Sequence, residues 1–418
     1  MQALPGFRDF LPSDCAVRNY VFAQWRAVSR RYGFVEYDGP LLEDLDLFKK
    51  KSGEEIAKQL YDFTDKGGRA VALRPEMTPT LARMAAASHR DFKKPMKWFS
   101  IPQMFRYERP QRGRLREHYQ YNADIIGEAG VEAEVELLAL CVDVLRAFGF
   151  TAEDVVVRIS DREFWVEFLR KHKVPEERWQ EMLETIDKSE REPREKTAAR
   201  LGELAEPVFQ VFDGGGTSEK LDQLMAGLRV RGLADYVQVD LRIVRGLAYY
   251  TGVVFEAFDR GGKLRAIAGG GRYDHLIGHL SDGAASLPAL GFAMGDVVLG
   301  ELLKESARAR SQMEAAVSSA QQLDVYVVIA KEERRADALG AVQAMRDAGY
   351  RVDCPLLPAK VGKQFQTAEQ LNAKFAVLVG DEWPQVKLKT LASREEQLFP
   401  HEELLAHLAR LHSLSSQL

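Results

Sequence analysis

A segment of sixteen residues, FRYERPQRGRLREHYQ (105–120), contains five arginines and two glutamates in a chain whose formal net charge is only −4. Guanidinium groups bind phosphate and carboxylate oxygens in pairs, so clustered arginines indicate an anionic partner. A polyanion responds to the patch that it contacts rather than to the net charge of the whole protein. The mildly acidic total therefore does not exclude a nucleic-acid partner for this segment.

The sequences on either side of this segment predict an antiparallel β-hairpin, formed by MFRYE and LREHYQYNADII with RPQRGRL at its tip. Because strand side chains alternate between two faces, Arg106 and Glu108 share one face of the first strand. One face of the second strand carries His118, Gln120, Asn122 and Asp124. Such a polar face fits the floor of a ligand site, because buried polar groups need partners. It fits equally well a sheet with one side in water.

Other segments in the first half of the chain predict the elements that hold this hairpin. Apolar residues at helical spacing predict a helix from a candidate N-cap at Ser13 to Gly33, and the strand after it ends at Pro40. The sequence LYDFTDKGGRAVAL predicts two strands joined by a turn. Residues 131–148 predict a helix with one apolar face, which we expect to lie in the core.

The later part of the chain divides by composition. Charge-dense helical sequence fills residues 169–235 and is interpreted as a solvated helical insertion. Strand-like sequence returns in residues 236–312. The Ala-, Ser- and Gln-rich stretch SARARSQMEAAVSSAQQ is interpreted as a linker. Residues 321–418 alternate strand and helix at the spacing of a small α/β domain.

Composition excludes several classes of protein. With 46% hydrophobic and 29% charged residues, the chain is typical of globular proteins of two to four domains. Its three cysteines, Cys15, Cys141 and Cys354, are too widely spaced for a disulfide framework or a zinc site, and we expect no protein-bound metal. Neither a signal peptide nor an apolar run of eighteen residues is present, so we expect a cytoplasmic protein with no membrane partner.

Four motifs in order give a family resemblance that covers nearly all of the 418 residues: LRPEMT (73–78), FRYERPQRGRLREHYQ, VRGLAYYTG (244–252) and AGGGRYD (268–274). Together they resemble the histidyl-tRNA synthetases, which are class II aminoacyl-tRNA synthetases, and most of all their organelle-type branch. The resemblance implies ATP-dependent activation of L-histidine to histidyl-adenylate and its transfer to the 3′ end of tRNA(His). It also implies Mg²⁺ as a cofactor.

The same resemblance implies an α+β fold. The class II catalytic domain, an antiparallel six-stranded sheet with flanking helices, would occupy residues 1–168 and 236–312, interrupted by the helical insertion at 169–235. Residues 321–418 would form the C-terminal α/β anticodon-binding domain. The first helix and strand resemble motif 1, which forms the dimer interface in this family, so a homodimer is expected.

Roles at the nucleotide follow from the second motif. The resemblance implies that Arg106 binds the α-phosphate of ATP, that Glu108 accepts a hydrogen bond from the adenine amino group, and that Arg114 reaches the outer phosphates. His118 stands where the family usually has a phenylalanine that stacks on adenine. In and beside the hairpin tip, Gln111 and Arg116 would contact the acceptor end of tRNA.

The other motifs imply a site for the amino acid. Glu76 and Thr78 would bind the α-amino group of histidine. Four residues would surround its side chain, namely Gln120, Asp124, Tyr250 and Tyr273. The catalytic residue implied by VRGLAYY is Arg245, acting with Arg106 on the phosphoryl oxygens as the histidine carboxylate attacks the α-phosphorus.

Several positions depart from the family pattern. Ala248 replaces an aspartate, and Asp124 replaces the glutamate of many bacterial members. In the third motif, LGFAMGDVVLGELL, Val298 replaces the arginine that binds the γ-phosphate. Because valine cannot bind phosphate, Arg114 or Mg²⁺ would have to neutralise more of that charge.

Two rival functions remain open at this point. One is the regulatory paralogue that binds an ATP phosphoribosyltransferase, but that group generally lacks the anticodon-binding domain and so does not account for residues 321–418. The other is a non-catalytic sensor of uncharged tRNA, which Val298 favours. A P-loop is excluded, because no GxxxxGK[ST] occurs. The pair His275 and His279 lacks the glutamate of a metalloprotease helix.

Overall fold

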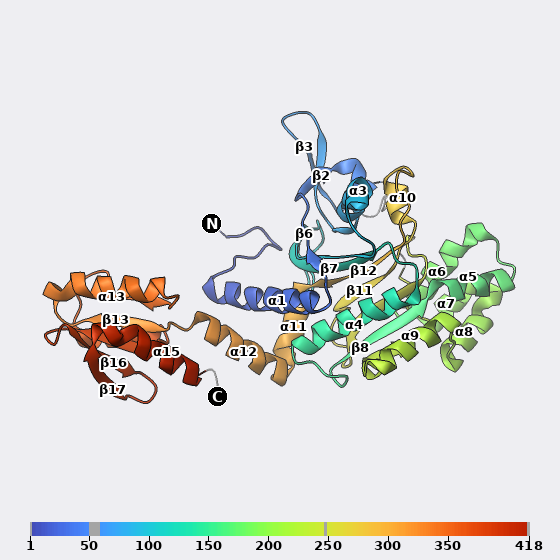
Figure 1. Ribbon diagram of the computed structural model, residues 1–418. Coiled ribbons are helices and arrows are strands. Elements are labelled where there is room, and N and C mark those ends of the chain that lie inside the picture. Colours follow the sequence, from blue (N-terminus) through green and yellow to red (C-terminus); the bar gives the residue numbers. More distant parts are fainter. Residues whose placement is uncertain (1, 50–58, 246–248, 416–418) are drawn as a thin grey trace. The chain divides into compact units, whose positions relative to one another are not determined.

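The computed structural model describes residues 2–49, 59–245 and 249–415 (Figure 1). The chain divides into two compact units, Met1–Glu314 and Ala315–Leu418. The predicted C-terminal domain began six residues later, at 321. No helix within the described residues is long and apolar enough to cross a membrane.

The first unit is built on a large sheet, to which the described residues contribute nine strands. These are β1 (Val35–Glu36), β5 (Met96–Ser100), β6 (Gln103–Phe105), β7 (Glu117–Ile126), β8 (Val155–Asp161), β9 (Val237–Val239), β10 (Val253–Asp259), β11 (Ala268–Arg272) and β12 (Ala289–Gly295). Six strands in the order β5-β7-β12-β11-β10-β8 are antiparallel, as the family resemblance implies. The sheet is mixed, because β1 pairs parallel with β5 at one edge and β9 with β8 at the other.

One face of this sheet is covered by α1 (Pro12–Arg31) and α4 (Val131–Ala147), as Figure 1 shows. The odd-numbered residues of β7 point to that face: Tyr121, Ala123 and Ile125 are at most 1% exposed. The ring of Trp25 in α1 stacks on Tyr121 at 5.6 Å, and the hydroxyls of Ser29 and Tyr121 are 2.7 Å apart. The helices therefore leave the opposite, polar face of β7 for the cavities.

The predicted N-cap at Ser13 is wrong by two residues. Helix α1 begins at Pro12, and Leu11 occupies the N-cap position. Proline suits the first helical position, because its φ is already helical and its missing N–H would have no partner there. The Asp14 carboxylate accepts a hydrogen bond from the Leu11 N–H at 3.2 Å, so the cap depends on Asp14.

A second, small sheet has the order β2-β4-β3, with β2 (Leu42–Asp44), β3 (Tyr61–Thr64) and β4 (Ala70–Leu73). The predicted turn between β3 and β4 is present, since Asp65 accepts N–H groups from Gly67 and Arg69. Helix α3 (Thr78–Ser88) follows β4. Two helices border β12 in sequence, α10 (Leu276–Leu280) before it and α11 (Asp296–Glu305) after it.

Helices fill the segment predicted as an insertion. They are α6 (Trp179–Lys188), α7 (Arg194–Leu201), α8 (Ala205–Gly214) and α9 (Glu219–Val230), preceded by α5 (Arg162–Lys171). The segment is not fully solvated, because Met182, Ile186 and Leu224 are fully buried. Helix α9 packs against α4, where Gly227 allows close approach to Val135.

The second unit has five strands among its described residues, ordered β14-β13-β15-β16-β17. They are β13 (Val325–Ile329), β14 (Val352–Asp353), β15 (Phe375–Val379), β16 (Gln385–Thr390) and β17 (Glu396–Pro400), with helices α13 (Arg335–Asp347), α14 (Val361–Gln370) and α15 (Leu404–Ser415). The predicted linker is a helix, α12 (Ala307–Gln321). Its alanines, arginines and two glutamines favour helix, and the linker interpretation overlooked that propensity.

Candidate active site

The polar face of the large sheet has a floor of small residues. Strand pairing places Asn122 opposite Ala293, Ala293 opposite Gly269, and Gly269 opposite Glu256. One step along, Asp124 lies opposite Gly291 and Gly291 opposite Gly271. Glycine and alanine in β11 and β12 therefore leave an open space between polar side chains on β7 and on β10. Two cavities occupy that space.

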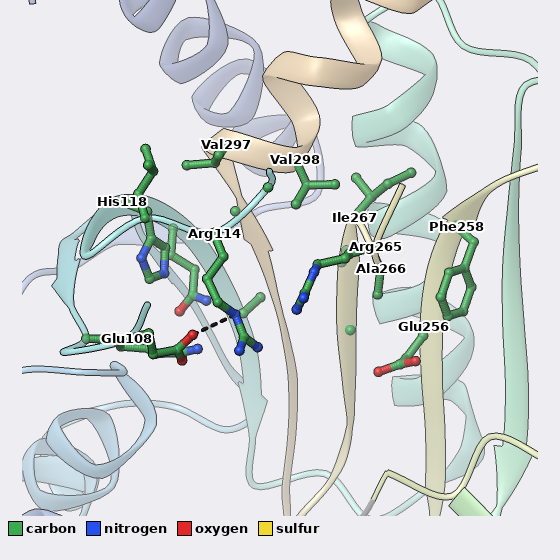
Figure 2. Close-up of a pocket in the computed structure, with 18 of the residues that line it drawn as sticks. Glu108, Arg114, His118, Glu256, Phe258, Arg265, Ala266, Ile267, Val297 and Val298 are labelled. Carbon is green, nitrogen blue, oxygen red and sulfur yellow. Dashed lines mark ion pairs between the residues drawn. The ribbon is translucent and has the colours of Figure 1, made fainter. Parts of the chain in front are cut away.

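The larger cavity has a volume of about 700 Å³ and is rich in positive charge. The described residues that line it include five arginines and two glutamates: Arg106, Arg114, Arg191, Arg245, Arg265, Glu108 and Glu256. Several of them are visible in Figure 2, together with His118, Val297 and Val298. An excess of three positive charges in one cavity suits an anion of several charges, such as a nucleoside triphosphate.

The smaller cavity, of about 220 Å³, has a different lining. Its described polar residues include two carboxylates, two side-chain amides and three tyrosines, namely Glu76, Asp124, Gln120, Asn122, Tyr249, Tyr250 and Tyr273. Thr78 lines it as well. A small cavity with carboxylates and several hydrogen-bonding groups suits an amino acid whose ammonium and side chain both need partners.

Five residues line both cavities, namely Arg106, Gln120, Arg245, Gly269 and Ala293. The two cavities therefore adjoin, and Arg106 and Arg245 both lie at their common boundary. A negative charge that develops between the two cavities would form beside Arg106 and Arg245. The structure brings these two predicted residues together although they are far apart in the sequence.

Arg245 is held from several sides. Its Nη1 lies 3.3 Å from the carbonyl oxygen of Phe255 and 3.6 Å from a carboxylate oxygen of Glu256. Its guanidinium lies over the ring of Tyr250 at 5.6 Å. Burial alone lowers the pKa of Arg245, but the nearby Tyr250 and Glu256 raise it above its ordinary value. Its φ of 50° is uncommon for a residue other than glycine and is typical of functional positions.

The other nucleotide-side residues are also arranged by specific contacts. Arg106 donates to the carbonyl of Pro75 at 2.9 Å. Arg114 and Glu108 form an ion pair at 2.6 Å, which Figure 2 shows as a dashed line. Burial, together with the positive charges of Arg106 and Arg8, lowers the pKa of His118 to about 3. His118 is therefore a neutral ring at physiological pH.

Asp124 is fixed at the base of the smaller cavity. The Tyr273 hydroxyl donates a hydrogen bond to Asp124 at 2.5 Å, and burial beside this carboxylate raises the pKa of Tyr273. The opposite residue must be glycine, because a Cβ on Gly291 would come within 1.8 Å of Asp124 Oδ1. The position of this carboxylate thus depends on residues from β7 and β12 and on Tyr273, which directly follows β11.

The three glycines of AGGGRYD make room for a side chain and for the neighbouring strands. Only Gly269 lines the cavities, and its missing side chain makes room for Arg245. Gly270 and Gly271 instead allow close packing against the neighbouring strands, at Gly291 and Val253.

Two family models match the chain. Residues 6–296 match the model of histidyl-tRNA synthetase, and residues 324–411 match that of an anticodon-binding domain. The chain belongs to the histidyl-tRNA synthetase family. It is 45% identical to "Histidine--tRNA ligase" of Opitutus terrae, with 97% of each chain covered. It is 41% identical to the chloroplastic/mitochondrial histidine--tRNA ligase of Arabidopsis thaliana, over 94% of this chain and 83% of that one.

Solved structures of histidyl-tRNA synthetases share the fold. The enzyme from Nostoc superposes with a TM-score of 0.78 at 23% identity, covering 98% of this chain and 99% of the other. The apo enzyme from S. aureus gives 0.72 at 24% identity, covering 98% and 100%. At this level of identity the likeness shows the fold alone, which is the predicted α+β fold with a separate C-terminal α/β unit.

Not every predicted residue lies in the cavities of this synthetase. Gln111 is exposed at the hairpin tip, where it pairs with Arg114 in an isolated bridge. Arg116 turns away from both cavities, because it donates to the carbonyl of Glu108 at 3.1 Å and lies over the Tyr107 ring at 4.4 Å. Ala248 lies outside the described residues.

Three charged residues of the larger cavity were missed from the sequence: Arg191, Glu256 and Arg265. Arg191 belongs to the insertion, whose charges were read as solvated. Glu256 lies in a mainly apolar strand, β10, where nothing in the sequence marks it as a site residue. A signal for Arg265 was present, because residues 265, 267 and 269 alternate onto the face that carries Gly269.

Proposed function

We propose that this chain activates L-histidine with ATP and transfers the histidyl group to tRNA(His). One observation carries the proposal: an arginine-rich cavity and a carboxylate-containing cavity adjoin, with Arg106 and Arg245 lining both. The two substrates of the activation step are a polyanion and a zwitterion, and their reacting groups must meet. The family relationship supports the same reaction.

In the larger cavity we assign the nucleotide contacts. Arg106 would bind the α-phosphate, Arg114 the outer phosphates, and Glu108 the adenine amino group. Glu108 is already paired with Arg114, so binding of ATP has to share or replace that ion pair. The neutral ring of His118 would stack on adenine, since a protonated imidazole there would face the two nearby arginines.

In the smaller cavity we assign the contacts to histidine. Glu76 and Thr78 would bind the α-amino group, which needs a carboxylate partner. The imidazole would lie among Gln120, Asp124, Tyr250 and Tyr273, whose donors and acceptors can match its two nitrogens. An analogue without those nitrogens would leave buried polar groups unpaired, and this would reduce its use by roughly 10⁴-fold.

The activation step needs no general base from the protein. The histidine carboxylate, ionised at neutral pH, forms a bond to the α-phosphorus, and the bond from phosphorus to the oxygen bridging to the β-phosphate breaks. Pyrophosphate leaves with that electron pair. Negative charge grows on the α-phosphoryl oxygens, where Arg106 and Arg245 would stabilise it without reorganising.

Mg²⁺ use is part of this proposal. Among the described residues there is no cluster of three or more His, Cys, Asp or Glu placed to hold a metal. Mg²⁺ commonly keeps water ligands and binds through phosphates with one or two carboxylates, and Glu256 is a carboxylate of the larger cavity that could serve. When bound, the ion would neutralise charge on the outer phosphates.

We assign tRNA contacts to both compact units. Gln111 at the hairpin tip would contact the acceptor end, with Arg116 beside it. The second unit would bind the anticodon, in keeping with the family match over residues 324–411. Deleting residues 321–418 should leave adenylate formation measurable but weaken charging of tRNA. Equal loss of both activities would contradict a separate anticodon module.

A homodimer and a cytoplasmic location complete the proposal. Five of the exposed large apolar side chains fall within the first forty-two residues, near the motif 1 sequence: Leu4, Leu11, Val35, Leu41 and Leu42. Such exposure suits a surface covered by a second copy. Sedimentation of the wild type should give twice the chain mass, and Val35→Glu with Leu41→Glu should lower it.

The direct test is histidine-dependent exchange of labelled pyrophosphate into ATP. The proposal predicts exchange that requires histidine and is not supported by other amino acids. Neither a regulatory paralogue nor a tRNA sensor would support exchange. Absence of exchange in a folded, full-length preparation would favour one of those two.

A further inference from the structure

Val298 carries no charge, so another residue of the larger cavity would have to bind the terminal phosphate of ATP. Val298 lines the larger cavity and is 9% exposed. Its position in the first turn of α11 is where the family places an arginine. An apolar side chain at this point leaves a region of the cavity wall without a donor.

Arg265 lies beside that region. A Cβ built on Gly113 of the hairpin tip would lie 3.5 Å from Val298 Cγ2 and 3.9 Å from Arg265 Cδ. The two side chains therefore border the same glycine. In Figure 2, the guanidinium groups of Arg265 and Arg114 point toward one another, with Val298 close to them.

The backbone around Arg265 is fixed. This residue lies in the connection between β10 and β11, and the buried Asp259 accepts hydrogen bonds from the N–H groups of Lys263 and Leu264, at 2.9 and 3.0 Å. On the other side, Ile267 donates to the Ala257 carbonyl at 2.7 Å and is 1% exposed. Because the backbone is hydrogen-bonded on both sides of Arg265, its side chain can face the cavity without a loop first becoming ordered.

The guanidinium of Arg265 has no carboxylate partner among the residues that the structure describes. Arg114 is paired with Glu108 and Arg245 is close to Glu256. By contrast, Arg265 makes no ion pair with any residue that the structure describes, and its side chain is exposed at the cavity. A guanidinium facing a cavity without a carboxylate partner is suited to an anion supplied by a ligand.

We propose that Arg265 binds the terminal phosphate of ATP and the departing pyrophosphate, in place of the arginine that Val298 replaces. This inference rests on the proposed nucleotide site. It predicts a contact to the phosphates that leave, and none to the α-phosphate or to adenine. Substitution of Arg265 should therefore weaken the binding of nucleotides that carry the outer phosphates and leave the binding of AMP unchanged.

The test compares equilibrium binding of ATP and AMP to the full-length protein, in the presence of Mg²⁺, for wild type, Arg265→Ala and Lys263→Ala. Lys263 is a matched control, since it is an exposed cation two residues away that does not line the cavity. Arg265→Ala should weaken ATP binding by about 10-fold or more and leave AMP binding unchanged, because a charge-assisted contact to the end of the chain is lost. Lys263→Ala should change neither.

The outcomes separate the two proposals. Equal weakening of ATP and AMP, or no weakening by Arg265→Ala, would overturn the role of Arg265 while leaving the nucleotide site standing. Failure of the wild type to bind either nucleotide would instead overturn the proposed function. In pyrophosphate exchange, Arg265→Ala should raise the KM for pyrophosphate by a similar factor and leave the KM for histidine unchanged.

Discussion

The guanidinium of Arg245 occupies the space that a side chain on Gly269 would fill. A Cβ on Gly269 would lie 1.7 Å from Arg245 Nη1, far inside van der Waals contact. The glycine and the arginine come from different motifs, and strand β11 brings them together. Position 269 must therefore lack a side chain for Arg245 to reach the boundary between the two cavities.

Gly269→Ala should displace Arg245 and lower the rate of adenylate formation by about 10²-fold, because a small misplacement of a catalytic group is costly. Rapid-quench measurement of histidyl-adenylate would show this. Gly300→Ala is the matched control, since no atom lies within 4 Å of a Cβ built there. A rate for Gly269→Ala equal to that of the control would show that Arg245 does not need this position.

Gly291→Ala should act on histidine and not on ATP. The added methyl would come within 1.8 Å of Asp124 Oδ1 and push this carboxylate away from Tyr273. We expect the KM for histidine to rise about 10-fold or more, because a buried hydrogen-bonding group loses its alignment. The KM for ATP should stay within about 2-fold. An equal rise in both constants would indicate general damage to the sheet.

His118→Phe should preserve ATP binding to within about 3-fold, because the imidazole is already neutral and serves as a ring.

His118 also makes the folding stability of the wild type depend on pH. An unfolded histidine has a pKa near 6.5, whereas the pKa of His118 is about 3, so the unfolded chain binds the additional proton between these values. Stability is therefore lost as the pH falls from about 6.5 toward 3.

Denaturation of wild type and His118→Phe at pH 7.5 and pH 5 measures this difference. Relative to the variant, the wild type should lose about 2 kcal/mol of unfolding free energy between those pH values. A difference that does not change with pH would show that His118 can take up a proton in the folded protein.

Arg272 and Glu134 should contribute strongly to stability. Their side chains are each 4% exposed and form two contacts of 2.6 Å, joining β11 to α4. Arg272→Ala leaves a buried carboxylate without its main partner and should cost about 3–5 kcal/mol of unfolding free energy. Urea denaturation would measure the change. Arg194→Ala breaks an exposed pair with Asp213, which water and salt screen, and should cost far less, so similar losses in the two variants would contradict the ranking.

The sequence predicted local features well and long-range pairing poorly. Alternation along one strand placed Gln120 and Asp124 on the site face correctly, because the period of a strand fixes its two faces. It could not show that Gly269 pairs with Glu256, since register between distant strands depends on the whole sheet. The same limit hid the contact between Gly269 and Arg245. The position of Arg191 was missed because charge in a helical segment does not show which charges turn inward.

The most direct test of the central claim is Arg245→Ala, measured by histidine-dependent pyrophosphate exchange and by equilibrium binding of histidine. If Arg245 stabilises charge at the boundary of the two cavities, exchange should fall by about 10²- to 10³-fold while histidine binding stays near that of the wild type. Exchange at the wild-type rate would contradict the account.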